Sequence, residues 1–393
     1  MSNTILPATG FAGTSPASRL GKHPRRRISR SLILAGLVLA VSVTALPASA
    51  AVWWSATPSV SIGSKAINVR DVGARGDGQH DDTSAIQAAI NSLPSTGGTI
   101  TVPAGTYMID ALRSINMRSH VRLLMSSGAQ LVAIPNSSSR SFVIKATNVN
   151  NIEISGGAIV GERARHRGTS GEWGMGIQIL GAQKVYLHDF KVSDCWGDGL
   201  YIGGSGHIGV PSTDVTLSNV VSNNNRRQGL SFGPVNRVYV VNSTFSNTHG
   251  TKPEAGIDIE PSTQGTAKNV RIERSTISGN AGSGVELQPN VSGVVITSST
   301  VKGNRGFGIY GHGVYNAWFA VNLITENGLD GVALVSPTHD VKITSNTITY
   351  NSTRWYIANN RSIYTATSSP RDLQIPSSLS NITVSNNTIT PTR

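Results

Sequence analysis

The chain has 393 residues and a formal net charge of +12, and only 6% of its residues are aromatic. Lys and Arg (33) outnumber Asp and Glu (21), but no basic patch is interleaved with aromatic residues, which argues against nucleic acid as a partner. The single cysteine, Cys195, excludes an internal disulfide, so stacked aliphatic side chains must stabilise the fold, and we expect Cys195 to be a small buried residue.

Residues 1–50 have the features of a signal peptide. A basic stretch precedes an apolar run over residues 32–46, and Ala48-Ser49-Ala50 offers a small-residue cleavage site. The apolar run is shorter than the roughly 20 residues that span a bilayer. We therefore predict a secreted or periplasmic protein with no membrane contact after cleavage; a retained membrane anchor is the alternative.

Removal of this segment changes the charge of the chain. The first 50 residues hold six Lys or Arg and no acid, so residues 51–393 carry 27 bases and 21 acids, a formal charge of +6. A modest positive field favours anionic partners such as uronic-acid polysaccharides. The length and the abundance of Gly, Ser, Thr, Asn and Val indicate one large all-β domain over residues 51–393.

The first predicted element after an extended leader (residues 51–66) is an amphipathic helix. Asp81 or Asp82 can cap its N-terminus, and Gly97-Gly98 lie beyond its end. Its apolar face consists of Ala85, Ile86, Ala89, Ile90 and Leu93. We expect residues of about 66–110 to cap the apolar end of a solenoid.

This N-terminal region also carries a recognisable motif. The sequence NVRDVGARGDGQHDDTSAIQAAI…GGTITVPAGTY, residues 68–107, closely resembles the start of the pectate-lyase and rhamnogalacturonase/epimerase-like superfamily. The resemblance implies a single-stranded right-handed parallel β-helix and, more loosely, action on polysaccharide. It leaves the reaction open, because that superfamily contains hydrolases, lyases, epimerases, transglycosidases and phage tailspikes.

A phrase of the type Gly-x-Gly-Ile-x-Ile recurs along the rest of the chain. Its copies begin at Gly174, Gly197, Gln228, Ala255, Ser283, Phe307 and Asp330. Each copy is followed by an apolar triplet that ends in Asn, and these Asn residues are spaced by roughly 24 residues with one gap of about 33. This period predicts a β-helix with coils over residues of about 100–390. We expect the Asn residues to form a ladder at turns with left-handed backbone: 223, 247, 280, 304, 327 and 351.

Four stretches interrupt the repeat. They are residues 162–173, 203–213, 248–254 and about 355–376. The first and third directly precede a Gly-x-Gly-Ile strand and the second directly follows one. Because the three border the same strand of the coil, we predict that they wall a binding groove on one face.

The alternation of the repeated strand predicts which side chains face that groove. Aliphatic residues point inward and the intervening residues point outward. The outward residues, in coil order, are Gln178, Tyr201, Ser231, Asp258, Glu286, Tyr310 and Ala333. One step later along the strands lie Glu260, Gln288 and His312. Since coils stack about 4.8 Å apart, Asp258 and Glu286 should be neighbours, with Asp198 and Tyr201 two coils below Asp258.

Stacked carboxylates predict acid/base chemistry. They repel each other, so one pKa should rise, which yields a protonated acid beside an ionised base or nucleophile. The preferred prediction is glycosidic cleavage by Asp258 and Glu286, with Glu260 and His312 tuning or binding. Carboxyls on neighbouring coils would be roughly 5–6 Å apart, near the retaining distance. Asp198 paired with Asp258 would be roughly 9–10 Å apart, near the inverting limit.

Residues at the rim of the groove are candidates for substrate binding. Arginine forks suit uronate carboxylates, and an indole can stack on a sugar ring. The candidates are Arg163, Arg165, Trp173, Arg226, Arg227 and Tyr310. For all of these residues a structural role, such as a solvated charge run or an indole packed into the fold, is the competing interpretation.

Two other functions stay open at this point. In a uronate lyase or C5-epimerase, Tyr201 or Tyr310 with His312 would move the proton, and arginines or a cation such as calcium would offset the uronate charge. The resemblance to polygalacturonases is partial: Gly311-His-Gly313 follows the acidic strands in the same order, but an Arg-Ile-Lys motif is absent. The third function is a non-catalytic carbohydrate-binding or adhesive β-helix. We predict no required cofactor and no metal ligands, and the oligomeric state is open.

Overall fold

The computed structural model describes residues 52–206, 209–365 and 372–390, all within one compact unit, Ala51–Arg393. The predicted signal peptide, residues 1–50, lies outside the described residues. Within the described ranges, no helix has both the length and the hydropathy that crossing a bilayer requires.

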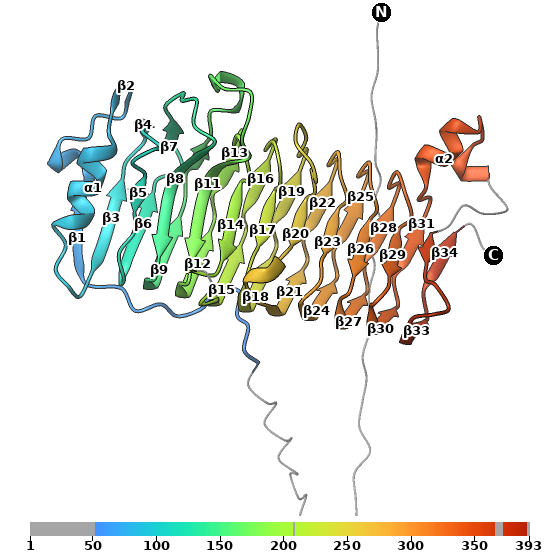
Figure 1. The fold of residues 1–393 in the computed structure, drawn as a ribbon. Coiled ribbons are helices and arrows are strands. Elements are labelled where there is room, and N and C mark those ends of the chain that lie inside the picture. The colour runs from blue at the N-terminus through green and yellow to red at the C-terminus, as the bar shows by residue number, and fades with distance from the viewer. Residues whose placement is uncertain (1–51, 207–208, 366–371, 391–393) are drawn as a thin grey trace, which may run out of the picture. The chain divides into compact units, whose positions relative to one another are not determined.

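Three parallel sheets run along the molecule, and each coil of the chain adds one strand to each sheet (Figure 1). Sheet 1 contains, in order, β1 (Lys65–Asn68), β3 (Gly98–Val102), β6 (Val121–Met125), β9 (Asn150–Ser155), β12 (Gln183–His188), β15 (Ser212–Ser218), β18 (Val235–Val241), β21 (Ala267–Glu273), β24 (Val291–Thr297), β27 (Tyr315–Ala320), β30 (His339–Thr344) and β33 (Ser380–Ser385). Sheet 2 contains β2 (Asp77–Asp81), β4 (Gly105–Ile109), β7 (Ala129–Ala133), β10 (Ala158–Val160), β13 (Lys191–Ser193), β16 (Val221–Asn223), β19 (Thr244–Ser246), β22 (Thr276–Ser278), β25 (Thr300–Lys302), β28 (Leu323–Thr325), β31 (Thr347–Thr349) and β34 (Thr388–Thr390). Sheet 3 contains β5 (Ile115–Asn116), β8 (Arg140–Thr147), β11 (Trp173–Leu180), β14 (Leu200–Gly203), β17 (Leu230–Phe232), β20 (Ile257–Ile259), β23 (Val285–Leu287), β26 (Ile309–His312), β29 (Val332–Val335) and β32 (Leu373–Gln374). The predicted parallel β-helix is therefore confirmed.

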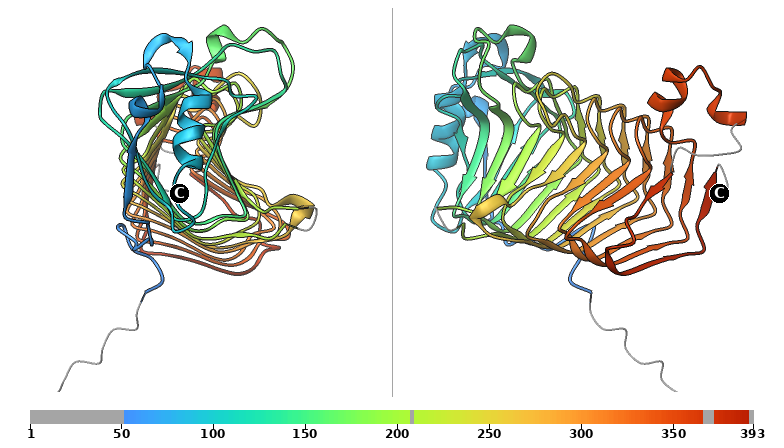
Figure 2. Two further views of the ribbon diagram at one scale, coloured as in Figure 1. Left: turned by 90° about the vertical axis from the view of Figure 1, so that its left-hand side faces the viewer. Right: turned by 45° about the vertical axis from the view of Figure 1, so that its right-hand side comes forward.

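Short helices interrupt the coils at a few places. They are η1 (Val69–Val72), α1 (Thr83–Asn91), η2 (Arg163–Arg165), η3 (Ser262–Gln264), α2 (Thr353–Ala358) and η4 (Ile363–Thr365). The predicted amphipathic helix is α1, which lies across one end of the coil stack in Figure 2 (left), with Ile86, Ala89 and Ile90 buried in the core. Asp81 Oδ1 accepts from the Thr83 backbone N–H, whereas the Asp82 carboxylate binds the preceding loop.

Columns of aliphatic side chains fill the interior. In sheet 3 one column is formed by register partners from consecutive coils, and every member is fully buried: Ile177, Leu200, Leu230, Ile257, Val285, Ile309 and Val332. Burying each such side chain stabilises the fold by about 1.5–3 kcal/mol relative to exposure. Cys195 is also buried, which confirms its expected place in the core.

An asparagine ladder is present, but its backbone differs from the prediction. The Nδ2 of Asn280, Asn304 and Asn327 each donates to the Oδ1 of the next Asn along the ladder, at 2.8–2.9 Å. The residue with left-handed backbone is usually the one that directly precedes each ladder Asn, such as Gly279 (φ 67°) before Asn280. Asn223 and Asn247 do not belong to this column, whose earlier members are Asn225 and Thr248. Asn247 Nδ2 donates to Asn223 Oδ1 at 2.8 Å, and Asn247 is the one predicted residue that has left-handed backbone (φ 57°). The buried amides must satisfy one another, so the preceding residue takes the strained conformation.

The leader follows the outer face of sheet 1. Tyr186 Oη donates to Ala56 O at 3.1 Å, and Thr216 Oγ1 donates to Ser55 O at 3.3 Å. Further along, Asn151 Oδ1 accepts from the Ser61 backbone N–H at 3.1 Å. These contacts hold the leader across successive strands of sheet 1.

The predicted insertions border sheet 3. Residues 162–173 lead into β11, residues 203–213 leave β14, and residues 248–254 lead into β20. In Figure 2 (left), the loop with η2 (green) and the turn with η3 (yellow) project beyond the coils. The outer face of sheet 3 thus lies between inserted segments, as expected for a binding face.

Candidate active site

The predicted ladder of outward residues is present on sheet 3. Backbone pairing aligns Tyr201 with Ser231, Ser231 with Asp258, Asp258 with Glu286, and Glu286 with Tyr310. The next column is also in register, because Ile259, Leu287 and Gly311 pair in order and precede Glu260, Gln288 and His312. The sequence therefore predicts the neighbours correctly.

The expectation that Asp258 projects into solvent is wrong, because Asp258 is 0% exposed, and the candidate Asp198 is also 0% exposed. Asp258 lies between two core residues of β20, so its side chain is on the outer side of sheet 3, but neighbouring side chains cover it. Gln228 Nε2 donates to Asp258 Oδ2 at 2.7 Å, and Asp258 Oδ1 has no hydrogen-bond partner. A buried carboxyl with one unpaired oxygen is costly when ionised.

Arg227 lies at the centre of the site and contacts three carboxylates. Its Nε donates to Glu172 Oε2 at 3.1 Å, and its Nη2 donates to Glu260 Oε1 at 2.8 Å. Its Nη1 lies 3.4 Å from Asp198 Oδ2, which also accepts from Ser231 Oγ at 2.9 Å. One guanidinium cannot neutralise this many acids, so the site favours protonation of some of them.

A cavity of about 170 Å³ opens over this cluster. Its lining residues are Trp173, Met175, Asp198, Tyr201, Arg227, Glu260, Ser262 and Gln264. The structure thus brings together five predicted site residues: Trp173, Asp198, Tyr201, Arg227 and Glu260. Asp258 and Glu286 lie beside the cavity and do not line it.

Burial raises the pKa of several carboxyls in this cluster. It raises the pKa of Asp198 to about 7, against the opposing effect of Arg227. Burial, followed by repulsion from Glu260 and Glu286, holds the pKa of Asp258 well above its usual range. Burial also raises the pKa of Glu286. Protonated carboxyls are therefore present on this face near neutral pH.

Tyr201 is the tyrosine that lines the cavity. A Cβ at Gly233 would lie 2.5 Å from its hydroxyl, so glycine is needed there for the ring to fit. Burial, followed by repulsion from Glu260 and Asp198, raises the pKa of Tyr201 to about 12. A neutral phenol with this pKa is a weak proton acceptor.

Tyr310 and His312 lie further along the helix, on β26. The Tyr310 ring stacks on Phe307 with centroids 5.2 Å apart, and neither Tyr310 nor His312 lines the cavity. The structure therefore separates the predicted Tyr310–His312 pair from Tyr201 and Arg227.

Three of the predicted rim arginines bind backbone carbonyls. Arg163 Nη1 donates to Asn224 O at 2.8 Å, and Arg165 Nη2 donates to Ala133 O at 3.2 Å. Arg226 Nη1 donates to Gly171 O at 2.7 Å. Because backbone groups already use their guanidinium groups, their geometry supports loop positioning instead of the expected substrate binding.

A buried network fixes the loop that supplies Trp173. His166 Nδ1 lies 2.9 Å from Glu162 Oε1, and the imidazole stacks on Trp196 at 3.9 Å. The Arg226 guanidinium lies 3.8 Å from the same indole. Trp173 follows this network in the chain and lines the cavity, and the Arg140 guanidinium lies 4.4 Å from the centre of its ring and orients it.

Sequence reasoning missed Glu172 and gave no role to Gln228 or Ser231. Glu172 directly precedes Trp173 in an insertion, and its contact with Arg227 depends on how that loop folds. Gln228 and Ser231 were visible as members of the repeated phrase, and the alignment of Ser231 with Asp258 was the available signal.

The charge partner of these acids is a guanidinium. Within residues 52–206, 209–365 and 372–390, no group of three or more His, Cys, Asp or Glu side chains is arranged to hold a metal ion. Glu172, Asp198 and Glu260 all face Arg227, which supplies the positive charge at their centre.

Comparisons with known proteins agree with the fold. Residues 66–249 match the family model for rhamnogalacturonase A/epimerase, pectate lyase-like, and residues 255–392 match the model for a right-handed β-helix region. The Bacillus subtilis protein YclG is 30% identical over 281 residues, which cover 61% of this chain and 48% of YclG. Mannuronan C5-epimerase AlgE1 of Azotobacter vinelandii is 56% identical over 43 residues, which cover 11% of this chain and 3% of AlgE1. The chain thus spans at most about half the length of these curated relatives.

Solved structures with different roles share this architecture. The A-module of the A. vinelandii mannuronan C-5 epimerase AlgE6 has a TM-score of 0.63 at 18% identity, covering 83% of this chain and 100% of that one. The surface adhesin PfbA of Streptococcus pneumoniae has a TM-score of 0.62 at 17% identity, covering 83% and 90%. At these identities the likeness shows the fold alone. The two family models match consecutive parts of residues 66–392, so the resemblance of the chain to the pectate-lyase and rhamnogalacturonase/epimerase-like superfamily is confirmed.

Proposed function

We propose that the protein is a secreted polysaccharide-active enzyme that cleaves glycosidic bonds over sheet 3, with Asp198 and Glu260 as its acid and base. The observation that carries the proposal is their placement around Arg227 in one cavity. Asp198, with its pKa raised to about 7, holds a proton near neutral pH, whereas Glu260 is ion-paired with the guanidinium. Glycosidic cleavage requires this combination of a protonated and an ionised carboxyl.

The geometry of Arg227 limits the distance between the two groups. The bonded oxygens of Asp198 and Glu260 contact neighbouring nitrogens of one guanidinium, so they lie no more than about 9 Å apart. This limit falls within the range of roughly 5–9.5 Å covered by retaining and inverting glycosidases. We assign the chemistry to this pair instead of Asp258 and Glu286, because Asp258 is buried outside the cavity.

In the proposed reaction, a sugar ring stacks on Trp173 and its glycosidic oxygen approaches Asp198. Asp198 donates its proton to that oxygen as the bond to the anomeric carbon breaks. Glu260 either takes a proton from an attacking water or attacks the anomeric carbon itself. Since Asp198 is covered in the free protein, Arg227 must shift when the sugar binds.

The charge of the cluster argues against a uronate at the cleavage point. A uronate carboxylate would approach Glu172, Asp198 and Glu260, and the nearest guanidinium is already engaged by all three. Lyases and epimerases need that carboxylate to be neutralised before the α-proton leaves. The cavity meets this need poorly, so we place glycosidic cleavage first.

A uronate lyase or C5-epimerase is the second candidate. Tyr201 beside Arg227 favours it, as a tyrosine could act on the α-proton. The 56% identity over 43 residues with a mannuronan C5-epimerase also favours it. The high pKa of Tyr201 weighs against this role.

A product assay separates these candidates. Acidic and neutral polysaccharides are incubated with the protein and read together for reducing ends and for ultraviolet absorbance from new double bonds. We expect reducing ends without absorbance, and we expect Glu260→Gln to lower turnover by at least about 100-fold because the base is lost.

Glu326→Gln is the matched control, since Glu326 is an acid whose side chain bonds Tyr364, outside the cavity. It should retain wild-type turnover. Unsaturated products that disappear in Tyr201→Phe would instead establish elimination, and full activity of Glu260→Gln would refute the assigned role. If the protein binds a polymer but does not turn it over, the non-catalytic, adhesive function would be supported instead.

A further inference from the structure

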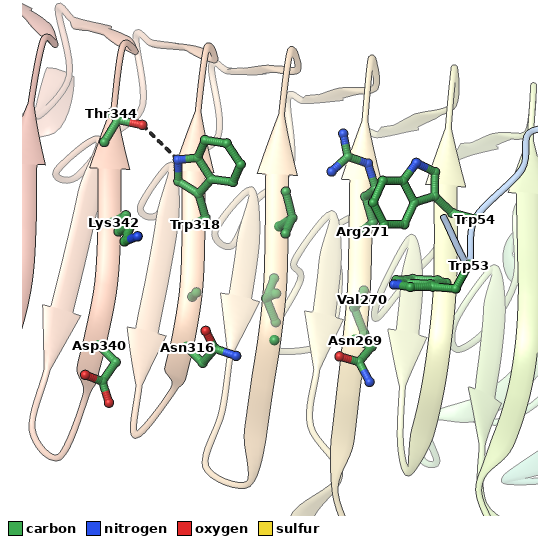
Figure 3. A pocket seen from close by; sticks show the side chains of 14 residues that line it. Trp53, Trp54, Asn269, Val270, Arg271, Asn316, Trp318, Asp340, Lys342 and Thr344 are labelled. Atoms are coloured by element: carbon green, nitrogen blue, oxygen red, sulfur yellow. Dashed lines mark hydrogen bonds between the residues drawn. The ribbon is translucent and has the colours of Figure 1, made fainter. Parts of the chain in front are cut away.

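A second groove lies on a different face of the β-helix from the candidate active site. It crosses the outer face of sheet 1 over β21, β24, β27 and β30, and its cavity measures about 480 Å³ (Figure 3). This volume is within the roughly 300–1,000 Å³ typical of ligand sites. We call it the sheet 1 groove.

Tryptophans form its two walls. On one side, Trp318 of β27 is 47% exposed, and its Nε1 donates to Thr344 Oγ1 at 2.8 Å (Figure 3). On the other side lie Trp53 and Trp54 of the leader, with centroids 5.3 Å apart. The Arg271 guanidinium lies 4.6 Å from the Trp54 ring. These contacts orient the indoles, so little side-chain freedom is lost when a ligand stacks on them.

Between the two tryptophan walls, the floor of the groove is formed by short side chains of β24. Arg271, Val295 and Trp318 are register partners on β21, β24 and β27, so about 10 Å separates the outer two. The strand between them, β24, lines the groove with Gly293, Val294 and Val295, none of which has a long side chain. Polar groups, among them Asn316, lie along the edges (Figure 3).

This combination of surfaces fits a chain of sugar rings. A pyranose has an apolar face of C–H groups and an edge of hydroxyls, which complement an exposed indole and polar side chains respectively. Within the described residues Lys342 forms no ion pair, whereas Arg271 pairs with Glu273. The unpaired ammonium of Lys342 can bind a carboxylate of an acidic polysaccharide.

We propose that the sheet 1 groove binds a polysaccharide chain as a second, non-catalytic site, with Trp318 and Trp53 stacking on its rings. The class of ligand rests on the proposed function, but binding here does not require the carboxylates of sheet 3. The groove would hold the polysaccharide on the enzyme while another part of the same polysaccharide, or a second polysaccharide molecule, occupies the active site.

The test is polymer binding by the full chain and its variants in affinity gel electrophoresis. Polygalacturonate, polymannuronate and a neutral glucan serve as probes. We expect Trp318→Ala to weaken binding about tenfold and Trp318→Phe to retain most of it, because a ring face remains. Lys342→Met should weaken binding of the acidic polymers alone. Trp355→Ala, at a comparably exposed indole of α2 outside the groove, should bind as wild type.

The same measurements in the Glu260→Gln background separate this proposal from the proposed function. If no polysaccharide is turned over but binding depends on Trp318, the groove is established and the proposed function fails. If the Trp318→Ala variant is folded, as its melting temperature would show, and binds polymer as well as wild type does, the proposed binding role of the groove would be overturned. The proposal would also be overturned if Trp318→Ala changed the sedimentation of the protein but not its polymer binding. That result would make this face a contact between two copies of the protein.

Discussion

At the residue scale, Arg227 determines what the neighbouring acids can do. It contacts Glu172, Asp198 and Glu260, and it leaves Asp258 with only an amide donor. Buried acids without a full counter-charge keep their protons to higher pH. The protein can therefore hold proton donors and ion-paired carboxylates side by side, and two measurable consequences follow from Asp198 and Asp258.

The pH dependence of turnover should report Asp198. A general acid must be protonated, so kcat/KM should fall as pH rises through about 7, the raised pKa of Asp198. Ser231 Oγ donates to Asp198 Oδ2 and thereby stabilises its ionised form. Ser231→Ala should move the alkaline limb of the profile to higher pH, as measured by initial rates from pH 5 to 9. An alkaline limb that stays in place in this variant would mean that another group controls it.

The stability of Asp258→Asn should differ from wild type in its pH dependence. The pKa of Asp258 is higher in the folded than in the unfolded chain, so its stabilising contribution is complete below about pH 4 and is lost as pH rises through the raised value. Asparagine cannot ionise and can still accept from Gln228. Between pH 4 and pH 8, the melting temperature of Asp258→Asn should rise relative to that of wild type as the pH increases. Parallel curves would show that Asp258 does not titrate on unfolding.

At the element scale, the inward and outward columns of each strand do different work. The inward aliphatic columns and the buried amide ladder bind coil to coil, while outward Tyr201 of β14 and residues that flank β14, β17 and β20 line the cavity. Alternation lets one strand serve both purposes. Outward residues can therefore be changed without disturbing the core, whereas the amide ladder cannot.

Asn304→Ala should lower stability by about 2–4 kcal/mol. Asn304 Oδ1 accepts from both the backbone and the side chain of Asn280, and its own Nδ2 donates to Asn327 Oδ1, so removal leaves buried polar groups unpaired. Denaturant unfolding measures the change. Asn150→Ala, at an exposed position, should stay within about 0.5 kcal/mol of wild type. Equal effects of the two substitutions would show that the ladder contributes no more than a surface amide.

At the scale of the whole molecule, the β-helix presents faces with different chemistry. The outer face of sheet 3 gathers acids between inserted loops, and the outer face of sheet 1 carries the tryptophan-walled groove. A rigid stack of coils can offer both surfaces at once, because the core is independent of either. In our proposals one face would cleave a polysaccharide while the other retains it.

The repeat in the sequence determined the architecture and the order of the ladder. Because each coil adds one strand to each sheet, spacing along the chain translates directly into neighbours on the sheet, and so Asp258 lies beside Glu286 as predicted. The apolar period of α1 likewise predicted a helix at the end of the core. These features depend on local pattern and on contacts between adjacent coils.

Tertiary structure alone decided burial, charge pairing and the second groove. Arg163 and Arg226 bind backbone carbonyls because folded loops bring those groups within reach, and Glu172 reaches Arg227 for the same reason. The leader crosses sheet 1 and places Trp53 near Trp318, although no repeat connects the two. Long side chains and inserted loops act across many coils, so their partners are set by packing in three dimensions and not by the period of the sequence.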